Sequence, residues 1–274
     1  MFARVPSSPD RLATLAQQLD VLAPDGGSVA DAVAACLDRQ RALEFQRRCP
    51  RPELGHLDYM AQAFEARDGR VVVVELRFRG LDVTRPFVEL RASNVGLAPH
   101  HVSDLLPAIG ARFAAVSPRR LRVYLTARQE ADPRWDELPS APELRIFAAP
   151  LARLRARPLP DQFDALELRD KDSSNKEAAL FAWEALVGGE LAGAIALECR
   201  PFGGEPGFAI VEQELAPEFR GRRLGAVMQR HAIERLEADG ICFGAIEPDN
   251  IASIKTARRI GRADVGGFRS FDMR

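Results

Sequence analysis

The chain has 274 residues, 46% of them hydrophobic, which is enough for one large domain or two of ordinary size. Its net charge of −1 excludes a global basic field that would recruit nucleic acid or an anionic membrane. The four cysteines lie far apart without CxxC or Cys/His spacing, so we expect free thiols and no metal site. Because there is no apolar N-terminal signal and no run of about 18 apolar residues, the sequence predicts a soluble cytoplasmic protein. The preference for Arg over Lys indicates a GC-rich bacterial source.

The first half of the chain begins with helical patterns and then changes to strand patterns. Apolar residues at helical spacing predict helices over 8–23 and 28–48. Residues 59–80 predict two strands that turn at Asp68-Gly69. Further strands are expected over 85–94, 119–127 and 143–154, and a helix over 100–116.

The second half shows a similar order of elements. A Pro- and Arg-rich segment, 152–162, has weak periodicity, and we place the domain boundary there, between residues 155 and 156. Beyond it we expect a strand over 164–170, a hairpin over 179–200 turning at Gly188-Gly189, strands over 206–215, 241–248 and 263–273, and helices over 222–240 and 250–261. Both halves therefore follow the order hairpin, strand, helix, strand, short segment, strand, a repeat of architecture with little residue identity.

An Arg/Gly cluster stands where the helix over 222–240 begins. It comprises Arg220, Gly221, Arg222, Arg223 and Gly225. A helix start exposes unpaired N–H groups and the positive end of the helix dipole, so it is a natural site for an anion. Glycines let the backbone approach a phosphate, and arginines add charge-assisted contacts. The alternative is an ordinary helix start with solvated arginines.

The order of motifs around this cluster resembles the GNAT superfamily of acyl-CoA-dependent N-acyltransferases. The family signature Q/R-x-x-G-x-G/A, preceded by V-x-P, is matched by "LAPEFRGRRLGA" at 215–226. A later family pattern is matched by Asn250, Ser253, Arg259 and Gly261. The resemblance covers about residues 163–274. It implies an α/β fold with two GNAT-like domains, each a mixed, mostly antiparallel sheet flanked by helices: a degenerate domain over 1–155 and an acetyl-CoA-binding domain over 156–274.

The resemblance also implies a set of cofactor contacts. The pyrophosphate of acetyl-CoA, the co-substrate, would rest on backbone N–H groups from Arg222 to Ala226, and its pantetheine arm would pair beside Leu215. A backbone N–H near Leu215 would polarise the thioester carbonyl. The cofactor-binding residues implied are Leu215, Arg220, Gly221, Arg222, Arg223, Leu224, Gly225, Ala226, Asn250 and Ser253.

Two positions depart from the family pattern. Arg223 stands where the family most often has Gly, although its backbone N–H is retained. Ala257 stands where many members carry a Tyr that serves as the acid near the leaving thiolate. The only tyrosines are Tyr59 and Tyr124, both in the first half, so a Tyr acid from the second half is excluded.

The candidate catalytic groups are Glu212 and Glu214, which share one face of a strand, about 7 Å apart, if its period is two. Either would accept a proton from the acceptor ammonium, often through water. The alternative is two solvated carboxylates, and a bulge would change the face of each. His231, in the middle of the helix, is interpreted as structural.

The sequence thus predicts an N-acetyltransferase that moves an acetyl group from acetyl-CoA to a primary amine by direct attack in a ternary complex. The acceptor is a small-molecule amine or a protein amine, and a homodimer is possible; nucleic acid, membrane and metal are not expected. A non-catalytic acyl-CoA-binding or regulatory module, favoured by the missing Tyr, and a pure scaffold are the alternatives.

Overall fold

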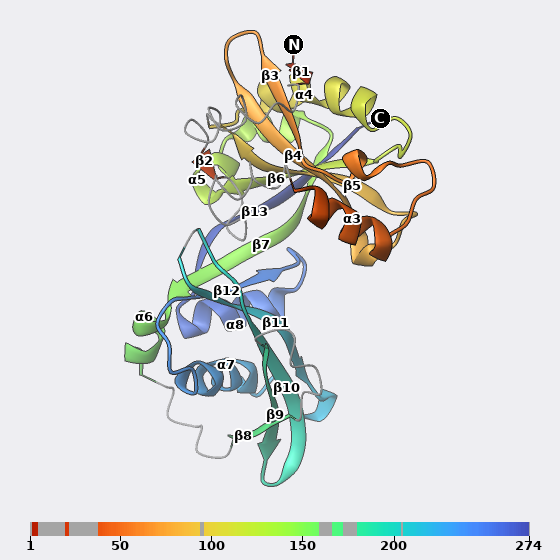
Figure 1. Cartoon of the computed structure of the whole chain (residues 1–274). Helices are drawn as coiled ribbons and strands as arrows, with labels where there is room; N and C mark the ends of the chain where they lie inside the picture. Colours follow the sequence, from red (N-terminus) through yellow and green to blue (C-terminus); the bar gives the residue numbers. More distant parts are fainter. Residues whose placement is uncertain are drawn as a thin grey trace. The chain divides into compact units, whose positions relative to one another are not determined.

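The computed structural model describes residues 2–4, 20–21, 38–93, 96–158, 166–171, 180–203 and 205–273 (Figure 1). Most of the helix expected over 8–23 lies outside these residues, as does 28–37, the first part of the next one. Asp20–Val21 form a short strand, β2, and Arg39–Arg48 form helix α3, as expected for the end of 28–48.

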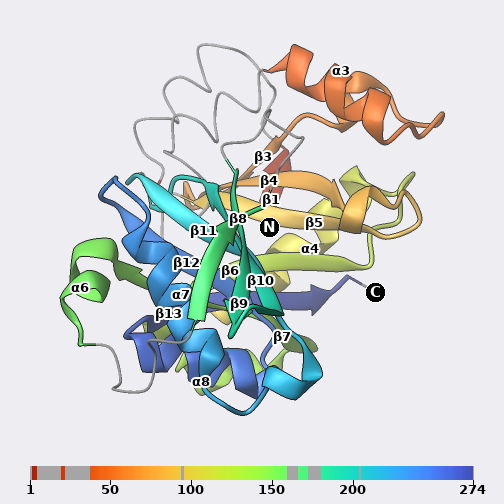
Figure 2. The same cartoon turned by 90° about the horizontal axis from the view of Figure 1, so that it is seen from below.

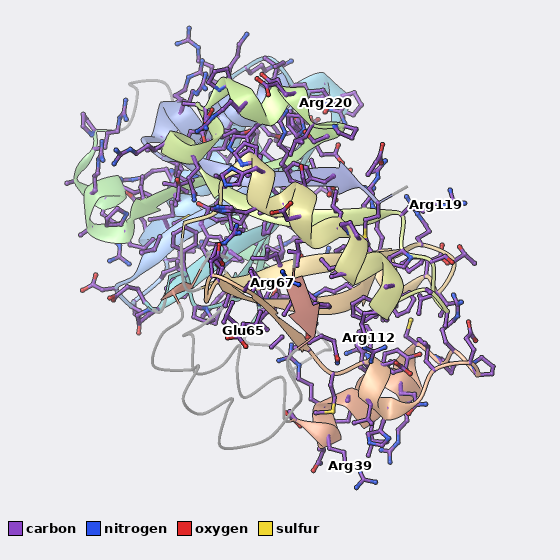
Figure 3. All side chains as sticks on the ribbon, turned by 90° about the horizontal axis from the view of Figure 1, so that it is seen from above. Arg39, Glu65, Arg67, Arg112, Arg119 and Arg220 are labelled. Atoms are coloured by element: carbon purple, nitrogen blue, oxygen red, sulfur yellow. The ribbon has the colours of Figure 1, made fainter. Side chains whose placement is uncertain are left out.

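The described part of the first half contains the strands and the helix over 100–116 that the sequence predicts, with several short additional elements; the strand expected over 143–154 ends at Pro150, where a helix follows. Its remaining elements are β1 (Phe2–Arg4), η1 (His56–Asp58), β3 (Gln62–Ala66), β4 (Val71–Phe78), η2 (Arg79–Leu81), β5 (Pro86–Ser93), α4 (Pro99–Arg112), β6 (Arg120–Thr126), α5 (Ala127–Glu130), η3 (Pro133–Glu137), β7 (Ser140–Pro150) and α6 (Leu151–Ala156). The β3–β4 hairpin turns at Asp68-Gly69 as predicted, because Gly69 takes the left-handed conformation (φ 82°). Arg112, labelled in Figure 3, ties the end of α4 to Asp58 with 2.8 Å between Nη1 and Oδ1.

The second half likewise follows the predicted order. Its elements are β8 (Leu166–Asp170), β9 (Leu180–Val187), β10 (Glu190–Cys199), β11 (Gly207–Leu215), η4 (Pro217–Phe219), α7 (Leu224–Glu234), β12 (Ile241–Ile246), α8 (Ile251–Ile260) and β13 (Ala263–Asp272). The expected helix end at Gly240 is wrong, because α7 stops at Glu234. Gly240 is instead needed where the backbone passes Pro206: a Cβ there would lie 2.6 Å from the Pro206 carbonyl oxygen.

The chain divides into two compact units, Met1–Glu143 with Phe268–Arg274, and Leu144–Gly267, here called unit 1 and unit 2. Strands β7 and β13 each begin in one unit and end in the other. The described strands hydrogen-bond in one mixed series, β1-β3-β4-β5-β6-β13-β7-β12-β11-β10-β9-β8, with β2 beside β5. The strands therefore form one mixed sheet, and the expectation of a separate sheet for each half is wrong.

Each unit repeats one arrangement of a hairpin, a third strand, a helix and a parallel strand. In unit 1, β5 pairs antiparallel with β4 and parallel with β6, and α4 connects them. In unit 2, β11 pairs antiparallel with β10 and parallel with β12, and α7 connects them. Both third strands carry an extra residue, Arg91 in β5 and Val211 in β11, where the register shifts. The predicted repeat of architecture is confirmed at this level.

The core of unit 2 holds α7 in place over the sheet. Buried side chains of α7, among them Val227 and Ile233, pack with Trp183 of β9 and Leu197 of β10. Helix α7 contacts strands β8, β10 and β11 and also α8 (Figures 1 and 2). Apolar burial of this extent fixes the first turn of α7 beside the end of β11. Within the described ranges, no helix is long and apolar enough to cross a membrane.

Candidate acyl-CoA site

An open backbone edge forms where β11 and β12 separate. Their parallel pairing joins Gly207–Ala209 to Ile241–Phe243 and then ends. The bulge at Val211 follows, and from Glu212 to Leu215 β11 pairs with β10. The other edge of this stretch has no strand partner among the described residues.

The polar groups of Leu215 point toward that open edge. The N–H of the next residue, Ala216, donates to the Ala192 carbonyl of β10 (2.9 Å). Because successive N–H groups of a strand alternate in direction, the N–H and C=O of Leu215 point the opposite way. The Leu215 carbonyl accepts a hydrogen bond from Nε of Arg220 at 2.8 Å. For an extended ligand at this edge, the Leu215 N–H is therefore available as a donor, whereas the Leu215 carbonyl is already hydrogen-bonded.

The loop from Ala216 to Arg223 presents a row of amides at the start of α7. Gly221 (φ 75°) and Arg223 (φ 65°) both take left-handed backbone conformations. In the described part of the chain, the backbone N–H groups of Gly221, Arg222, Arg223, Leu224 and Gly225 have no acceptor, and Ala226 is the first to bond, to the Arg223 carbonyl (3.1 Å). Unpaired donors at the positive end of a helix dipole are suited to an anion.

The arginine side chains of the loop are exposed but not equivalent. Arg220, labelled in Figure 3, is held by its bond to Leu215. The Arg222 guanidinium lies over the Phe219 ring, 5.6 Å from its centroid. Arg223 has a positive φ, a backbone conformation that favours glycine.

Gly225 is packed closely against neighbouring elements, a reason for glycine that the loop sequence alone did not indicate. The residue is buried, and a Cβ there would lie 3.0 Å from Nε2 of Gln213 and 3.5 Å from Oγ1 of Thr256. Its missing side chain thus permits the close approach of α7 to β11 and α8. At Gly221 no atom lies within 4 Å of a Cβ, so only its positive φ favours glycine there.

The second predicted motif lies at the start of α8. Asn250 is the N-cap, as predicted, and its Oδ1 accepts a hydrogen bond from the Ser253 N–H at 3.1 Å. Gly261 ends the helix with a φ of 103°. Ala257 is fully buried with Phe147 and Ile254, so this position supplies no proton donor.

Glu212 and Glu214 lie on one face of β11, downstream of the bulge. Gln213 between them turns toward α7, where its Nε2 donates to the Gly225 carbonyl, so both glutamates face the other side of the sheet. Both are exposed, and neither has an ion-pair partner among the described residues. Their cross-strand neighbours on β10 are Ala196 and Ala194, which leave the space beside the carboxylates open.

A buried polar chain beneath α7 was not predicted from the sequence. Gln213, Gln229 and Arg262 are joined by side-chain hydrogen bonds, and Gln229 and Arg262 are 2% and 3% exposed. The signal available was Gln229, a polar residue between the apolar positions of α7.

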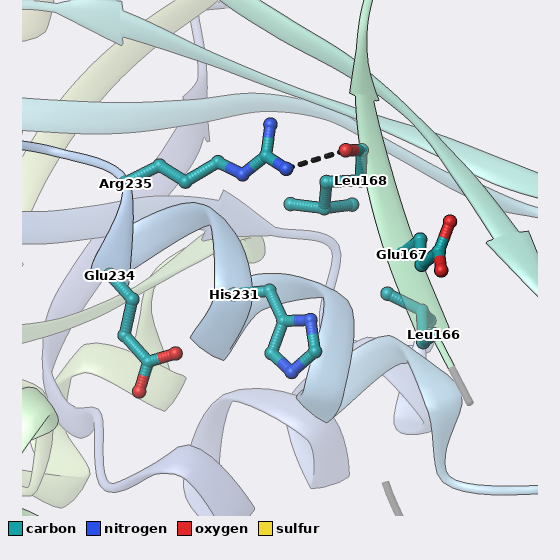
Figure 4. A pocket seen from close by; sticks show the side chains of 6 residues that line it. All are labelled: Leu166, Glu167, Leu168, His231, Glu234 and Arg235. Atoms are coloured by element: carbon teal, nitrogen blue, oxygen red, sulfur yellow. Dashed lines mark hydrogen bonds between the residues drawn. The ribbon is translucent and has the colours of Figure 1, made fainter. Parts of the chain in front are cut away.

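A pocket of about 420 Å³ lies on another part of unit 2 (Figure 4). Its lining residues are Leu166, Glu167, Leu168, His231, Glu234 and Arg235. Arg235 closes one side by donating to the Leu168 carbonyl at 2.6 Å. None of the predicted cofactor-binding residues lines this pocket. Among the described residues, no group of three or more His, Cys, Asp or Glu side chains is placed to hold a metal ion.

The α/β fold thus places the open amides of a helix start, donors suited to an anion, beside the free edge of β11. Residues 148–261 match the family model "Acetyltransferase (GNAT) family". No curated protein matches the chain.

Solved structures show the same fold over most of the chain. A "Tandem GNAT protein from the clavulanic acid biosynthesis pathway" is 11% identical, with a TM-score of 0.52, and the match covers 100% of this chain and 98% of that one. GCN5-related N-acetyltransferases from Sphaerobacter thermophilus and Kribbella flavida are 12% and 14% identical, each with a TM-score of 0.50. These matches cover 94% and 87% of this chain and 96% and 95% of the others.

Proposed function

We propose that the chain is an N-acetyltransferase whose unit 2 binds acetyl-CoA and transfers its acetyl group to a primary amine. The observation that carries this is the row of unpaired amides from Gly221 to Gly225, next to the open edge of β11. The match of 148–261 to the family model supports acetyl-CoA as the co-substrate, since binding it is typical of the family.

The residues present fit that co-substrate. The open amides supply donors for a diphosphate, and the exposed Arg223 side chain adds positive charge. The unbonded N–H of Leu215 is suited to a thioester or amide oxygen at the strand edge. Because Arg220 is hydrogen-bonded to the Leu215 carbonyl, the pantetheine arm of acetyl-CoA would bond to fewer backbone groups of β11 unless Arg220 moves.

Acetyl-CoA supplies an acyl thioester, whose carbonyl carbon the neutral amine attacks. The N–C bond forms, the C–S bond breaks, and CoA leaves as the thiolate. Glu212 or Glu214 takes the proton that the amine loses, directly or through water. A thiol pKa near 8.5 makes the thiolate a tolerable leaving group, so the reaction does not depend on a tyrosine acid.

Unit 1 is the degenerate half in this proposal. At the start of α4, Pro99 has no N–H, and the N–H groups of His101 and Val102 both bond to the Ala98 carbonyl. The Ala98 N–H in turn donates to Nδ1 of His101. This helix start lacks a donor at Pro99 and uses those of His101 and Val102 internally, so it leaves fewer donors for a phosphate than the start of α7.

A second candidate function is a non-catalytic acyl-CoA-binding module, which the buried Ala257 favours. Release of free CoA thiol with a panel of small amines and peptide N-termini separates it from the enzyme. Thermal stabilisation by acetyl-CoA separates both from a scaffold, since a ligand at 100 times its Kd adds about 2.7 kcal/mol to the free energy of unfolding. A cytoplasmic location and a homodimer belong to the same proposal.

A further inference from the structure

The buried polar chain connects three separate parts of unit 2. Gln213 on β11 donates from Nε2 to the Gly225 carbonyl at 2.7 Å. Gln229, one turn further along α7, donates from Nε2 to Oε1 of Gln213. Arg262, just after α8, donates from Nη2 to Oε1 of Gln229 at 3.0 Å. The chain therefore runs from the first turn of α7 to a buried guanidinium.

That guanidinium lies where β11 and β12 part. Gly244 follows Phe243, the last residue of β12 that pairs with β11. A Cβ on Gly244 would lie 2.8 Å from Nη1 of Arg262 and 3.6 Å from Cβ of Ile210 on β11. Because Gly244 has no side chain, there is room beside it for the Arg262 guanidinium, which lies between β11 and β12 where the open edge begins.

Arg262 is a buried cation without a carboxylate partner among the described residues. Its Nε has no acceptor, and its Nη1 reaches the Phe147 carbonyl only at 3.5 Å. Burial lowers the pKa of this guanidinium from its usual value. An unpaired buried charge destabilises a fold unless a counter-charge lies within its field.

Unit 1 has the same strand order but, among the described residues, no equivalent of the hydrogen-bonded series Gln213, Gln229 and Arg262. Counted from the bulge, the residue of β5 equivalent to Gln213 is Ser93. The inner face of α4 is apolar, with Val102, Leu105 and Ile109 fully buried. Within the described residues, the buried polar chain accompanies only the helix start with open amides.

The geometry points to a positioning role: Arg262, through Gln229 and Gln213, holds the first turn of α7 against β11 and adds positive potential behind the open amides. None of the three residues touches the reacting atoms. The inference rests on the proposed acetyl-CoA site, and it assigns to that site a supporting charge that the family signature does not include.

The test uses Arg262→Met and Gln229→Leu in the full chain, with Arg269→Met as the matched control. Arg269 is a buried arginine of unit 1, 6% exposed and paired with Asp136. Two readouts are taken: the Kd of CoA by calorimetry, and the hydrogen exchange of the 221–226 amides without ligand. We expect both test variants to weaken CoA by about tenfold and to speed exchange at 221–226, with Arg269→Met changing neither. Arg262→Lys, which keeps the charge, recovers part of the affinity.

The role is overturned if Arg262→Met and Gln229→Leu keep the wild-type Kd and exchange, or if they lower thermal stability alone. If Arg262→Met does not fold, Gln229→Leu and Arg262→Lys decide in the same way. If the wild type binds no CoA, the proposed function fails. The hydrogen-exchange rates without ligand then still decide whether the buried polar side chains position α7.

Discussion

Phe271, close to the C-terminus, packs its ring against Trp135, with the ring centroids 5.6 Å apart. Both side chains are 1% exposed and belong to the core of unit 1. The last strand of the chain thus completes the unit that contains the first residues, while Arg145–Pro150 of β7 pair with β12 in unit 2. Each unit depends on a strand that the sequence order assigns to the other half.

Phe271→Ala therefore lowers the stability of unit 1, by about 3–5 kcal/mol for a buried Phe. The chain has two tryptophans, Trp135 in unit 1 and Trp183 in unit 2, which serve as separate fluorescence probes. Urea unfolding of the Trp183→Phe protein, with and without Phe271→Ala, gives the change. An unaltered Trp135 transition would argue instead for the sequence-based boundary between 155 and 156.

Arg223→Gly is expected to stabilise the protein. A non-glycine residue in the left-handed region destabilises the folded state by roughly 1–2 kcal/mol. Glycine relieves this strain, but its greater freedom in the unfolded chain offsets about half of the gain. We predict a gain of about 0.5–1 kcal/mol in urea unfolding. Arg222→Gly is the control, because Arg222 has no positive φ and the same substitution loses stability there. A loss of similar size in both variants contradicts the backbone explanation.

Glu212→Gln is expected to slow acetyl transfer most at low pH, where the acceptor ammonium must lose a proton. General-base catalysis raises a rate by about 10²–10⁴-fold. We expect a smaller loss of rate here, because water can accept the proton in place of the carboxylate. Glu198→Gln is the matched control: Glu198 lies on the same face of the sheet but is paired with Arg200 at 2.6 Å. Equal pH–rate profiles for Glu212→Gln and the wild type would remove Glu212, and the same measurement on Glu214→Gln tests the second carboxylate.

Glu89 in unit 1 predicts a loss of stability in acid. Burial alone would raise the pKa of this 3% exposed carboxyl, but Arg77, Arg91 and Arg122 outweigh burial and lower it. A lowered folded pKa means that the stabilisation is full above the unfolded pKa and is lost as the pH falls below about 4.5, through the folded pKa.

Glu89→Gln removes this pH dependence and takes one shared carboxylate from three arginines, which keep Glu75 or Glu143 as partners. We expect a loss of about 3–5 kcal/mol at neutral pH, measured by urea unfolding with the Trp135 probe. If wild type and variant differ by the same amount at pH 7 and at pH 3, the carboxylate charge does not contribute as described.

Local patterns in the sequence were sufficient for most elements and for the loop. The turns at Asp68-Gly69 and Gly188-Gly189 need positive φ, which glycine announces, and both hairpins form there. The cluster at 220–225 does stand at a helix start, and Asn250 caps the next helix. Each of these features depends on residues close in sequence.

Features that depend on distant residues were not predictable. Strands β7 and β13 both mix polar and apolar residues, and nothing in either pattern says which unit each completes. Gly225 and Arg262 have roles set by contacts with Thr256, Gln229 and Gly244, which lie far along the chain. The sequence explained Gly225 by its neighbours in the loop, whereas its packing partners lie on other elements.

The most direct test of the central claim is a titration of the ¹⁵N-labelled chain with CoA, followed by amide NMR shifts. The account predicts that the amides of 221–225 shift strongly at saturation, as donors to a diphosphate, while those of 98–102 at the start of α4 do not. Shifts confined to α4, or none at 221–225 with CoA in excess, would contradict it.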